Sequence, residues 1–224
     1  MQYPFSCTSG VQDALERALS VARLGRYLPA AGGDRYRALR LYVWNARLCE
    51  AFYLPCQIAE ITIRNSISRA LSSHYKTDEW YTKGGFLCQL PPRLKGELDD
   101  VISDKRGDHG AGMTHDHVIA GLSFGFWTHT LTKNFENSGI WPKNISLAFP
   151  RAPINISRSD LYKRVDSVRS FRNRIAHHYA VFDKAPNSMH KDILEVIEWS
   201  CEETAWLVRG LSKVSQTINA RPRT

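Results

Sequence analysis

The feature that most constrains the fold is an apolar run at residues 57–71. Apolar side chains there occur nearly all the way round a helix instead of along one stripe. Such a helix is stable only where other elements cover most of its sides, so the run predicts a central helix around which the chain packs. Pro55 lies just upstream. Because proline lacks an N–H group and clashes with the preceding turn, we expect the helix that begins after Asp34 to end or bend there.

Helical periodicity also dominates the rest of the chain, and no segment shows the strict alternation of a convincing strand. We expect further helices at about residues 8–28, 92–103, 118–131, 157–179 and 189–211, joined by loops at 77–92, 104–117 and 137–153. The 224 residues, 43% of them hydrophobic, suffice for one core. The sequence therefore predicts a single all-α domain over residues 1–224, with an N-terminal helix within 1–27 and a disordered tail at 219–224.

Positive charge is the main bias of the composition, with a formal net charge of +8. The charge is uneven, because residues 151–174 hold seven Lys or Arg against two Asp. A basic surface favours a polyanionic partner such as RNA, although a charged helix face is more often simply solvated. The candidates for phosphate contacts are Lys163, Arg164, Arg169 and Arg174.

Cysteine usage and the chain start indicate the compartment. The five cysteines form no C-x-x-C pair and are odd in number, which suits reduced thiols in a cytosol better than disulfides or structural zinc. The first ten residues lack the basic start and apolar run of a signal peptide, and no long uncharged apolar span follows. We expect a soluble, cytoplasmic protein that does not enter a membrane.

The helix expected at residues 157–179 carries the candidate site. Ser157 can cap it, and Asp160 three residues later can complete a capping box. At roughly 100° per residue, one face collects the apolar side chains Leu161, Val165, Val168, Ile175 and Tyr179. Arg172 falls within about 20° of Leu161. A guanidinium in an apolar stripe is costly unless a partner or a ligand pairs with it.

Arg172 begins a cluster that also contains Asn173, His177 and His178. An unperturbed imidazole, with a pKa of about 6.5, can donate or accept a proton at neutral pH. A guanidinium can bind a phosphate and stabilise the charge that develops as it reacts. These groups suffice for RNA cleavage without a metal or cofactor. Asn173, four residues before His177, would orient that imidazole.

A plainer interpretation competes with this chemistry. Arg172 can form a buried ion pair while the histidines simply end a helix, whose C-terminus favours cations. An arginine followed after four residues by a histidine also occurs at Arg69 and His74, so the pattern alone does not identify a nuclease.

A metal site in the loop at 104–117, which holds three His and three Asp, is a further alternative. His115 and His117 would not share a helix face there, so a polar loop in which Thr114 caps the next helix is the simpler interpretation.

Four blocks in order along the chain carry a family resemblance: ALRLYVWNARL at 38–48, LPCQIAEITIRNSISRAL at 54–71, LSFGFWTHTL at 122–131 and FRNRIAHHYAVF at 171–182. The chain resembles the Abi-like family, bacterial abortive-infection proteins of the HEPN superfamily, in which R-x4-6-H is the ribonuclease motif. The resemblance spans about residues 28–206. It implies an HEPN-like helical bundle with additional peripheral helices.

The resemblance also implies an activity and partners. The expected function is a metal-independent endoribonuclease, an RNA-targeting toxin of phage defence that an antitoxin holds in check, with Arg172 and His177 as the catalytic pair. His178 can replace or assist His177, because R-x5-H also fits the family pattern. HEPN ribonucleases commonly form the site between two domains, so we expect a homodimer with a composite active site. The alternative is a non-catalytic RNA- or protein-binding module of the same fold.

Supporting residues are expected in the E-x-x-x-R-N block of the central helix, which holds Glu60, Arg64 and Asn65. We expect this block to pack against the helix that carries Arg172. Glu60 can pair with Arg172 or orient His177, and an ion pair between Glu60 and Arg64, four residues apart, is the competing interpretation.

Overall fold

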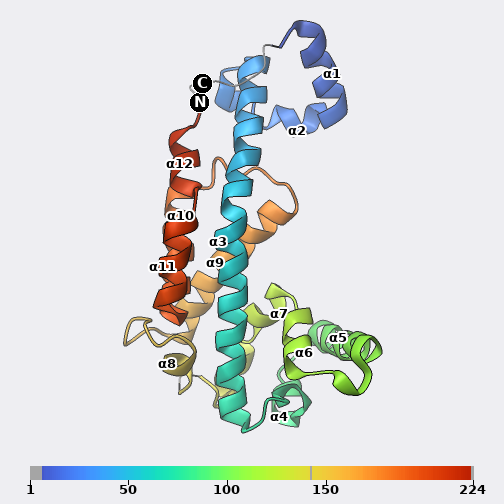
Figure 1. The fold of residues 1–224 in the computed structure, drawn as a ribbon, viewed down its shortest axis with the longest axis vertical. Coiled ribbons are helices and arrows are strands. Elements are labelled where there is room, and N and C mark those ends of the chain that lie inside the picture. Colours follow the sequence, from blue (N-terminus) through green and yellow to red (C-terminus); the bar gives the residue numbers. More distant parts are fainter. Residues whose placement is uncertain (1–6, 142, 223–224) are drawn as a thin grey trace.

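The computed structural model describes residues 7–141 and 143–222, and within them every regular element is a helix. The all-α prediction is therefore confirmed. Helix α3 (Arg35–Tyr75) runs the length of the molecule (Figure 1) and contacts helices from both ends of the chain, among them α2, α7, α9, α10 and α12. The predicted central helix is this element, and it is longer than the sequence suggests.

We expected the helix either to end or to bend at Pro55, and it does not end there. It continues through this residue, so the two predicted helices are one. Pro55 removes one backbone hydrogen bond, a cost of about 3 kcal/mol or more. Burial of Phe52, Cys56 and Ala59 on either side offsets it, since each fully buried large apolar side chain contributes roughly 1.5–3 kcal/mol.

The N-terminal segment forms two helices where one was expected. They are α1 (Ser9–Leu19) and α2 (Val21–Gly25), followed by the 3-10 turn η1 (Pro29–Ala31). The break lies at Ser20, whose φ of +72° is incompatible with a helix and whose side chain accepts from the Arg23 N–H at 3.3 Å. A serine hydroxyl that caps a new helix in this way competes with continuation of the old one.

Short helices gather at the end of the molecule where α3 finishes (Figure 1). They are η2 (Trp80–Thr82), α4 (Gly84–Leu87), α5 (Pro92–His109), η3 (Gly110–Gly112), α6 (His115–Gly121), α7 (Phe124–His129), η4 (Lys133–Ser138) and α8 (Ile145–Ala148). The helix predicted at 118–131 is interrupted because Ser123 caps α7 through the Phe126 N–H at 3.2 Å. Gly121 lets α5 approach α6, since a Cβ there would lie 2.6 Å from Val101 Cγ1.

The last third of the chain supplies α9 (Arg158–Ala176), α10 (Pro186–Ser200), α11 (Glu202–Leu211) and α12 (Val214–Asn219). The single helix predicted at 189–211 is divided by the extended backbone of Cys201. Residues 220–222 of the tail expected to be disordered pack against the bundle, where the Arg221 guanidinium lies 5.3 Å from the Trp44 ring centroid. Residues 223 and 224 of that tail lie outside the described residues.

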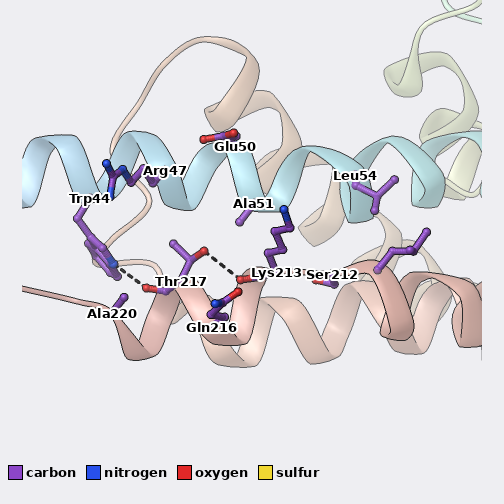
Figure 2. Close-up of a pocket in the computed structure, with 11 residues that line it drawn as sticks. Trp44, Arg47, Glu50, Ala51, Leu54, Ser212, Lys213, Gln216, Thr217 and Ala220 are labelled. Atoms are coloured by element: carbon purple, nitrogen blue, oxygen red, sulfur yellow. Dashed lines mark hydrogen bonds between the residues drawn. The ribbon is translucent and has the colours of Figure 1, made fainter. Parts of the chain in front are cut away.

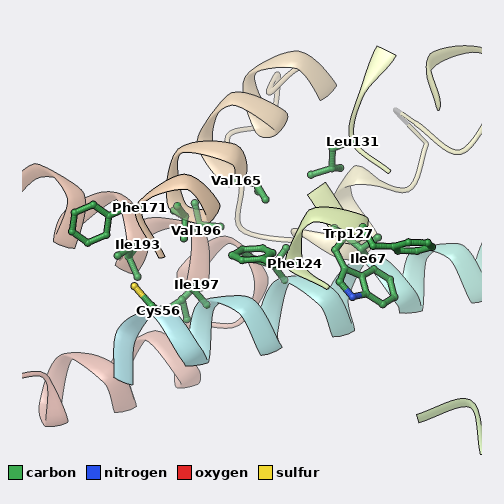
Figure 3. Close-up of a cluster of buried hydrophobic side chains, with 14 of the residues drawn as sticks. Cys56, Ile67, Phe124, Trp127, Leu131, Val165, Phe171, Ile193, Val196 and Ile197 are labelled. Atoms are coloured by element: carbon green, nitrogen blue, oxygen red, sulfur yellow. The ribbon is translucent and has the colours of Figure 1, made fainter. Parts of the chain in front are cut away.

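The core sits where α7, α9 and α10 meet the middle of α3. Figure 3 shows Cys56 and Ile67 of α3 among side chains from these three helices. The other labelled members are Phe124, Trp127, Leu131, Val165, Phe171, Ile193, Val196 and Ile197. Because α9 contributes to this cluster, the core fixes the position of the helix that carries the motif.

Candidate active site

The motif helix begins where the sequence predicts. The Ser157 hydroxyl accepts from the backbone N–H of Asp160 at 3.0 Å and donates to the Asp160 carboxylate at 2.7 Å. A hydroxyl in this position satisfies one of the free N–H groups of the first turn. Further along, the Phe171 ring packs edge-on against Phe52 of α3, with centroids 4.8 Å apart. Packing against α3 therefore extends to the residue before Arg172.

The helix ends earlier than predicted. His177 is its C-cap and His178 has a left-handed φ of +58°. The N–H of His178 donates to Ile175 O at 3.0 Å and that of Tyr179 to Arg174 O at 2.8 Å, the pair of bonds that defines a Schellman ending. Tyr179, expected on the apolar face, is therefore turned out of the helix and is 58% exposed. The expected stripe ends with Ile175, which is partly buried.

Arg172 has the partner that its place in the stripe requires. Its Nε lies 2.8 Å from Glu60 Oε2 of α3, and its Nη1 donates to the Asn173 side-chain oxygen at 3.2 Å. Of the two interpretations of Glu60, the pair with Arg172 is the one observed. Arg64 instead donates to Asn65 Oδ1 at 3.4 Å. Two nitrogens of the Arg172 guanidinium are thus oriented, and none of the hydrogen bonds or ion pairs among the described residues involves the third.

Asn65 does not pack against α9, although we expected the whole block to do so. It is exposed and lines a polar cavity of about 450 Å³ with Arg69 and His115. The reason is geometric, because five residues along a helix correspond to a rotation of about 140°. Glu60 and Asn65 therefore cannot both face α9.

The two imidazoles are exposed just beyond the helix end. The backbone N–H of His177 donates to Asn173 O at 2.9 Å, while the Asn173 side chain is engaged with Arg172. The His178 carbonyl accepts from Arg23 Nη1 of α2 at 3.0 Å. The bond from His177 to Asn173 is an ordinary helical backbone bond, and the Asn173 side chain is oriented toward Arg172, so the contact by which Asn173 was expected to orient the His177 imidazole is not among those of the described residues. Helix α2 holds the backbone of His178. His178 also lines a cavity of about 400 Å³ together with Ile175 and residues of α1, α2 and α3.

A small recess of about 120 Å³ adjoins the Arg172–Glu60 pair. Helix α3 lines it with Tyr53, Cys56, Gln57 and Glu60, and α9 with Arg172, Ile175 and Ala176. Burial raises the pKa of the Cys56 thiol to about 12, so that side chain is a neutral wall at physiological pH.

The basic residues expected to contact phosphate are engaged within the chain. Ion pairs join Lys163 to Asp160, Arg164 to Asp192 and Glu195, and Arg169 to Asp166. Arg174 donates to the Ala180 carbonyl at 2.8 Å and lies 5.7 Å from the Tyr179 ring centroid. Of the four, Lys163 is the most open, with 71% of its side chain exposed. Contact with RNA stays a prediction for all of them.

Asn45 is a supporting residue that sequence reasoning missed. Its side chain is buried on α3, and its Oδ1 accepts from the backbone N–H groups of Val181 and Phe182 at 2.9 and 3.0 Å. These bonds fasten the segment that follows the motif. The available signal was an amide within the apolar pattern of residues 38–48, since a buried amide requires a partner.

A larger cavity of about 610 Å³ lies elsewhere, between α3 and the C-terminal helices (Figure 2). Its lining includes Trp44, whose Nε1 donates to Thr217 O at 2.7 Å, together with Arg47, Leu54 and Lys213. Its lining residues lie outside the motif, so it does not belong to the candidate site.

Four further expectations from the sequence concern a metal site, the cap of α6, the cysteines and a membrane span. No group of three His, Cys, Asp or Glu side chains there is close enough to hold a metal ion. Thr114 caps α6 as expected, and the His117 Nδ1 accepts from the Thr114 N–H at 3.1 Å. The five cysteines are free thiols. None of the helices among the described residues is long and apolar enough to cross a membrane.

No family model, curated protein or solved structure matches this chain. The Abi-like resemblance therefore rests on the four sequence blocks, and what it implies is a proposal.

Proposed function

We propose that this protein is a metal-independent endoribonuclease of the HEPN type, with Arg172 and His177 as its catalytic pair. The observation that supports this best is the geometry at the end of α9. Arg172 is held by Glu60 and Asn173 with one guanidinium nitrogen left to a ligand, and the exposed imidazole of His177 follows at the helix end.

The reaction requires only acid–base and phosphate-binding groups. The 2′-oxygen of a ribose bonds to the adjacent phosphorus while a general base removes its proton, and the bond from phosphorus to the 5′-oxygen breaks as a general acid protonates that oxygen. The products are a 2′,3′-cyclic phosphate and a 5′-hydroxyl. Arg172 stabilises the charge on the non-bridging oxygens. His177 transfers a proton, and His178 is the second imidazole available to assist.

A second copy of the chain completes the site in this proposal. A base and an acid act on opposite sides of the phosphate, so two imidazoles from facing copies of α9 suit the reaction better than one. The proposed assembly is a two-fold homodimer with both copies of Arg172 and His177 around one cleft. The biological role that follows from the resemblance is a cytoplasmic RNA-targeting toxin of phage defence, restrained by an antitoxin.

The decisive experiment is cleavage of mixed RNA by purified protein in excess chelator. We expect cyclic phosphate ends, and loss of cleavage in the Arg172→Ala/His177→Ala variant. The matched control is Arg69→Ala/His74→Ala. This variant removes an arginine and a histidine with the same spacing on α3, away from the motif, and should cleave normally. Cleavage that stops in chelator and returns with added metal, or that survives the Arg172/His177 variant, refutes the proposal.

The shared site is tested by mixing wild type with His177→Ala chains. Mixed dimers of the two should depress activity below simple dilution. Activity in strict proportion to the wild-type fraction, or a fully active monomer, would reject a composite site.

The Arg172–Glu60 pair favours one competing function, a non-catalytic RNA- or protein-binding module in which this pair only joins α3 to α9. In that case RNA would bind without being cleaved, and His177→Ala and Arg174→Ala would both change only the binding affinity.

A further inference from the structure

The recess beside Arg172 has the chemistry of a binding subsite for one flat ring. Tyr53 stands four residues before Gln57 and seven before Glu60, so the three share a face of α3. Tyr53 is 63% exposed, although its neighbours Phe52 and Cys56 are buried. Its ring is therefore presented to the recess and to solvent instead of serving the core.

The size and lining of the recess restrict its occupant. Drug-sized ligands take cavities of roughly 300–1,000 Å³, and this one measures about 120 Å³. Ile175 and Ala176 form the apolar wall on α9, and the Gln57 amide offers both a donor and an acceptor at the rim. Arg172 and Glu60 also line the recess. An aromatic ring with polar edges, attached to an anion that can reach Arg172, matches the apolar wall, the Gln57 amide and the guanidinium together.

We propose that the recess holds one unstacked nucleobase of single-stranded RNA, stacked on Tyr53 and contacted along its edge by Gln57, next to the phosphate bound by Arg172. This identification of the ligand rests on the proposed function. A base inside a duplex is already stacked on both faces, so it cannot enter. The site thereby selects unpaired RNA, and Tyr53 determines that specificity.

Binding is measured in a His177→Ala background, so that the RNA stays intact. The probes are a fluorescent single-stranded RNA of mixed sequence, the same strand in a duplex, and an abasic ribose-phosphate oligomer of equal length. Tyr53→Ala should weaken binding of the single strand by about tenfold, within the range of base–aromatic stacking. Binding of the duplex and of the abasic oligomer should not change, because neither presents a free base.

Matched variants separate stacking from simple surface loss. Tyr53→Phe keeps the ring and should retain affinity, whereas Tyr53→Leu keeps apolar bulk without the flat face and should behave like Tyr53→Ala. Trp206→Ala removes another exposed aromatic residue, 72% exposed on α11, and should have no effect.

The inference fails if Tyr53→Ala binds the single strand as well as its parent, or if it loses the same affinity for the abasic oligomer. Its failure is distinguishable from that of the nuclease proposal. RNA cleavage with a KM that Tyr53→Ala leaves unchanged refutes the subsite and leaves the nuclease standing. Weakened binding in Tyr53→Ala, in a protein that cuts no RNA, supports the subsite and refutes the nuclease.

Discussion

His178 occupies a backbone conformation that few side chains adopt, with a φ of +58° at the turn that ends α9. A Cβ atom in the left-handed region crowds the neighbouring carbonyl oxygen, at a cost of roughly 1–2 kcal/mol. Glycine, the usual residue at this helix position, avoids that cost. A histidine is therefore held where the backbone would accept glycine more easily.

We predict that His178→Gly raises the free energy of unfolding by about 1 kcal/mol, because it relieves the strained turn. Urea denaturation measures this change. His177→Gly is the control and should destabilise, since His177 has a φ of −94° that an ordinary side chain adopts without strain. The cleavage rate of His178→Gly then shows whether the imidazole of His178 assists the reaction. A loss of stability in His178→Gly would contradict the account of the turn.

For single residues, the sequence predicted contacts well where a charged side chain in an apolar stripe required a partner. Arg172 in an apolar stripe required a partner, and Glu60 was predicted to pair either with Arg172 or with Arg64; the pair with Arg172 is the one observed. The position of Asn65 was wrong because a block was treated as a unit, although a helix turns its members to different sides. Asn45 was missed because the residues that it binds follow α9, and sequence alone does not show where that segment passes.

Elements were predicted best where a side chain marks their boundary. Ser157 is a capping residue that predicts the start of α9. No such residue predicts its end, because a histidine occupies the position where a glycine would have indicated the turn. At Pro55 the local rule was overridden by burial on both sides. Helices predicted as continuous are divided at Ser20, Ser123 and Cys201. Hydrophobic periodicity does not reveal such breaks, because one or two non-helical residues hardly change the pattern.

The side-chain amide of Asn45 holds the segment that follows α9 in place. Asn45→Ala leaves the N–H groups of Val181 and Phe182 buried without their acceptor. Each such group costs about 1–3 kcal/mol, so we expect the free energy of unfolding to fall by about 3 kcal/mol. Urea denaturation tests this, with exposed Asn65→Ala as the control that should stay within about 0.5 kcal/mol of wild type. Equal stability of the two variants would show that the bonds to Asn45 are unimportant.

Across the whole molecule, burial lowers the pKa of four histidines, namely His74, His115, His129 and His190. The unfolded chain takes up these protons near its ordinary pKa of 6.5, whereas the folded chain takes them up only at lower pH. The unfolded state therefore binds more protons below that value, and the stability present above about pH 6.5 is lost as the pH falls.

We predict a lower urea midpoint at pH 5.5 than at pH 7.5. His190→Gln should reduce the difference, because burial alone lowers the pKa of His190. A midpoint that does not fall between these two pH values would contradict the prediction.

The contacts from α2 to the end of the motif also have a consequence for biosynthesis. Arg23 bonds the carbonyl of His178, 155 residues later, and Arg26 bonds Asp183, 157 residues later. At roughly 5–20 residues per second of translation, the first partner waits about 8–30 s for the second. The turn that carries both imidazoles thus gains its contacts with α2 only after more than 150 further residues have been synthesised. A nascent chain paused after residue 176 contains the residues of every helix through α9 and still lacks both histidines of the motif.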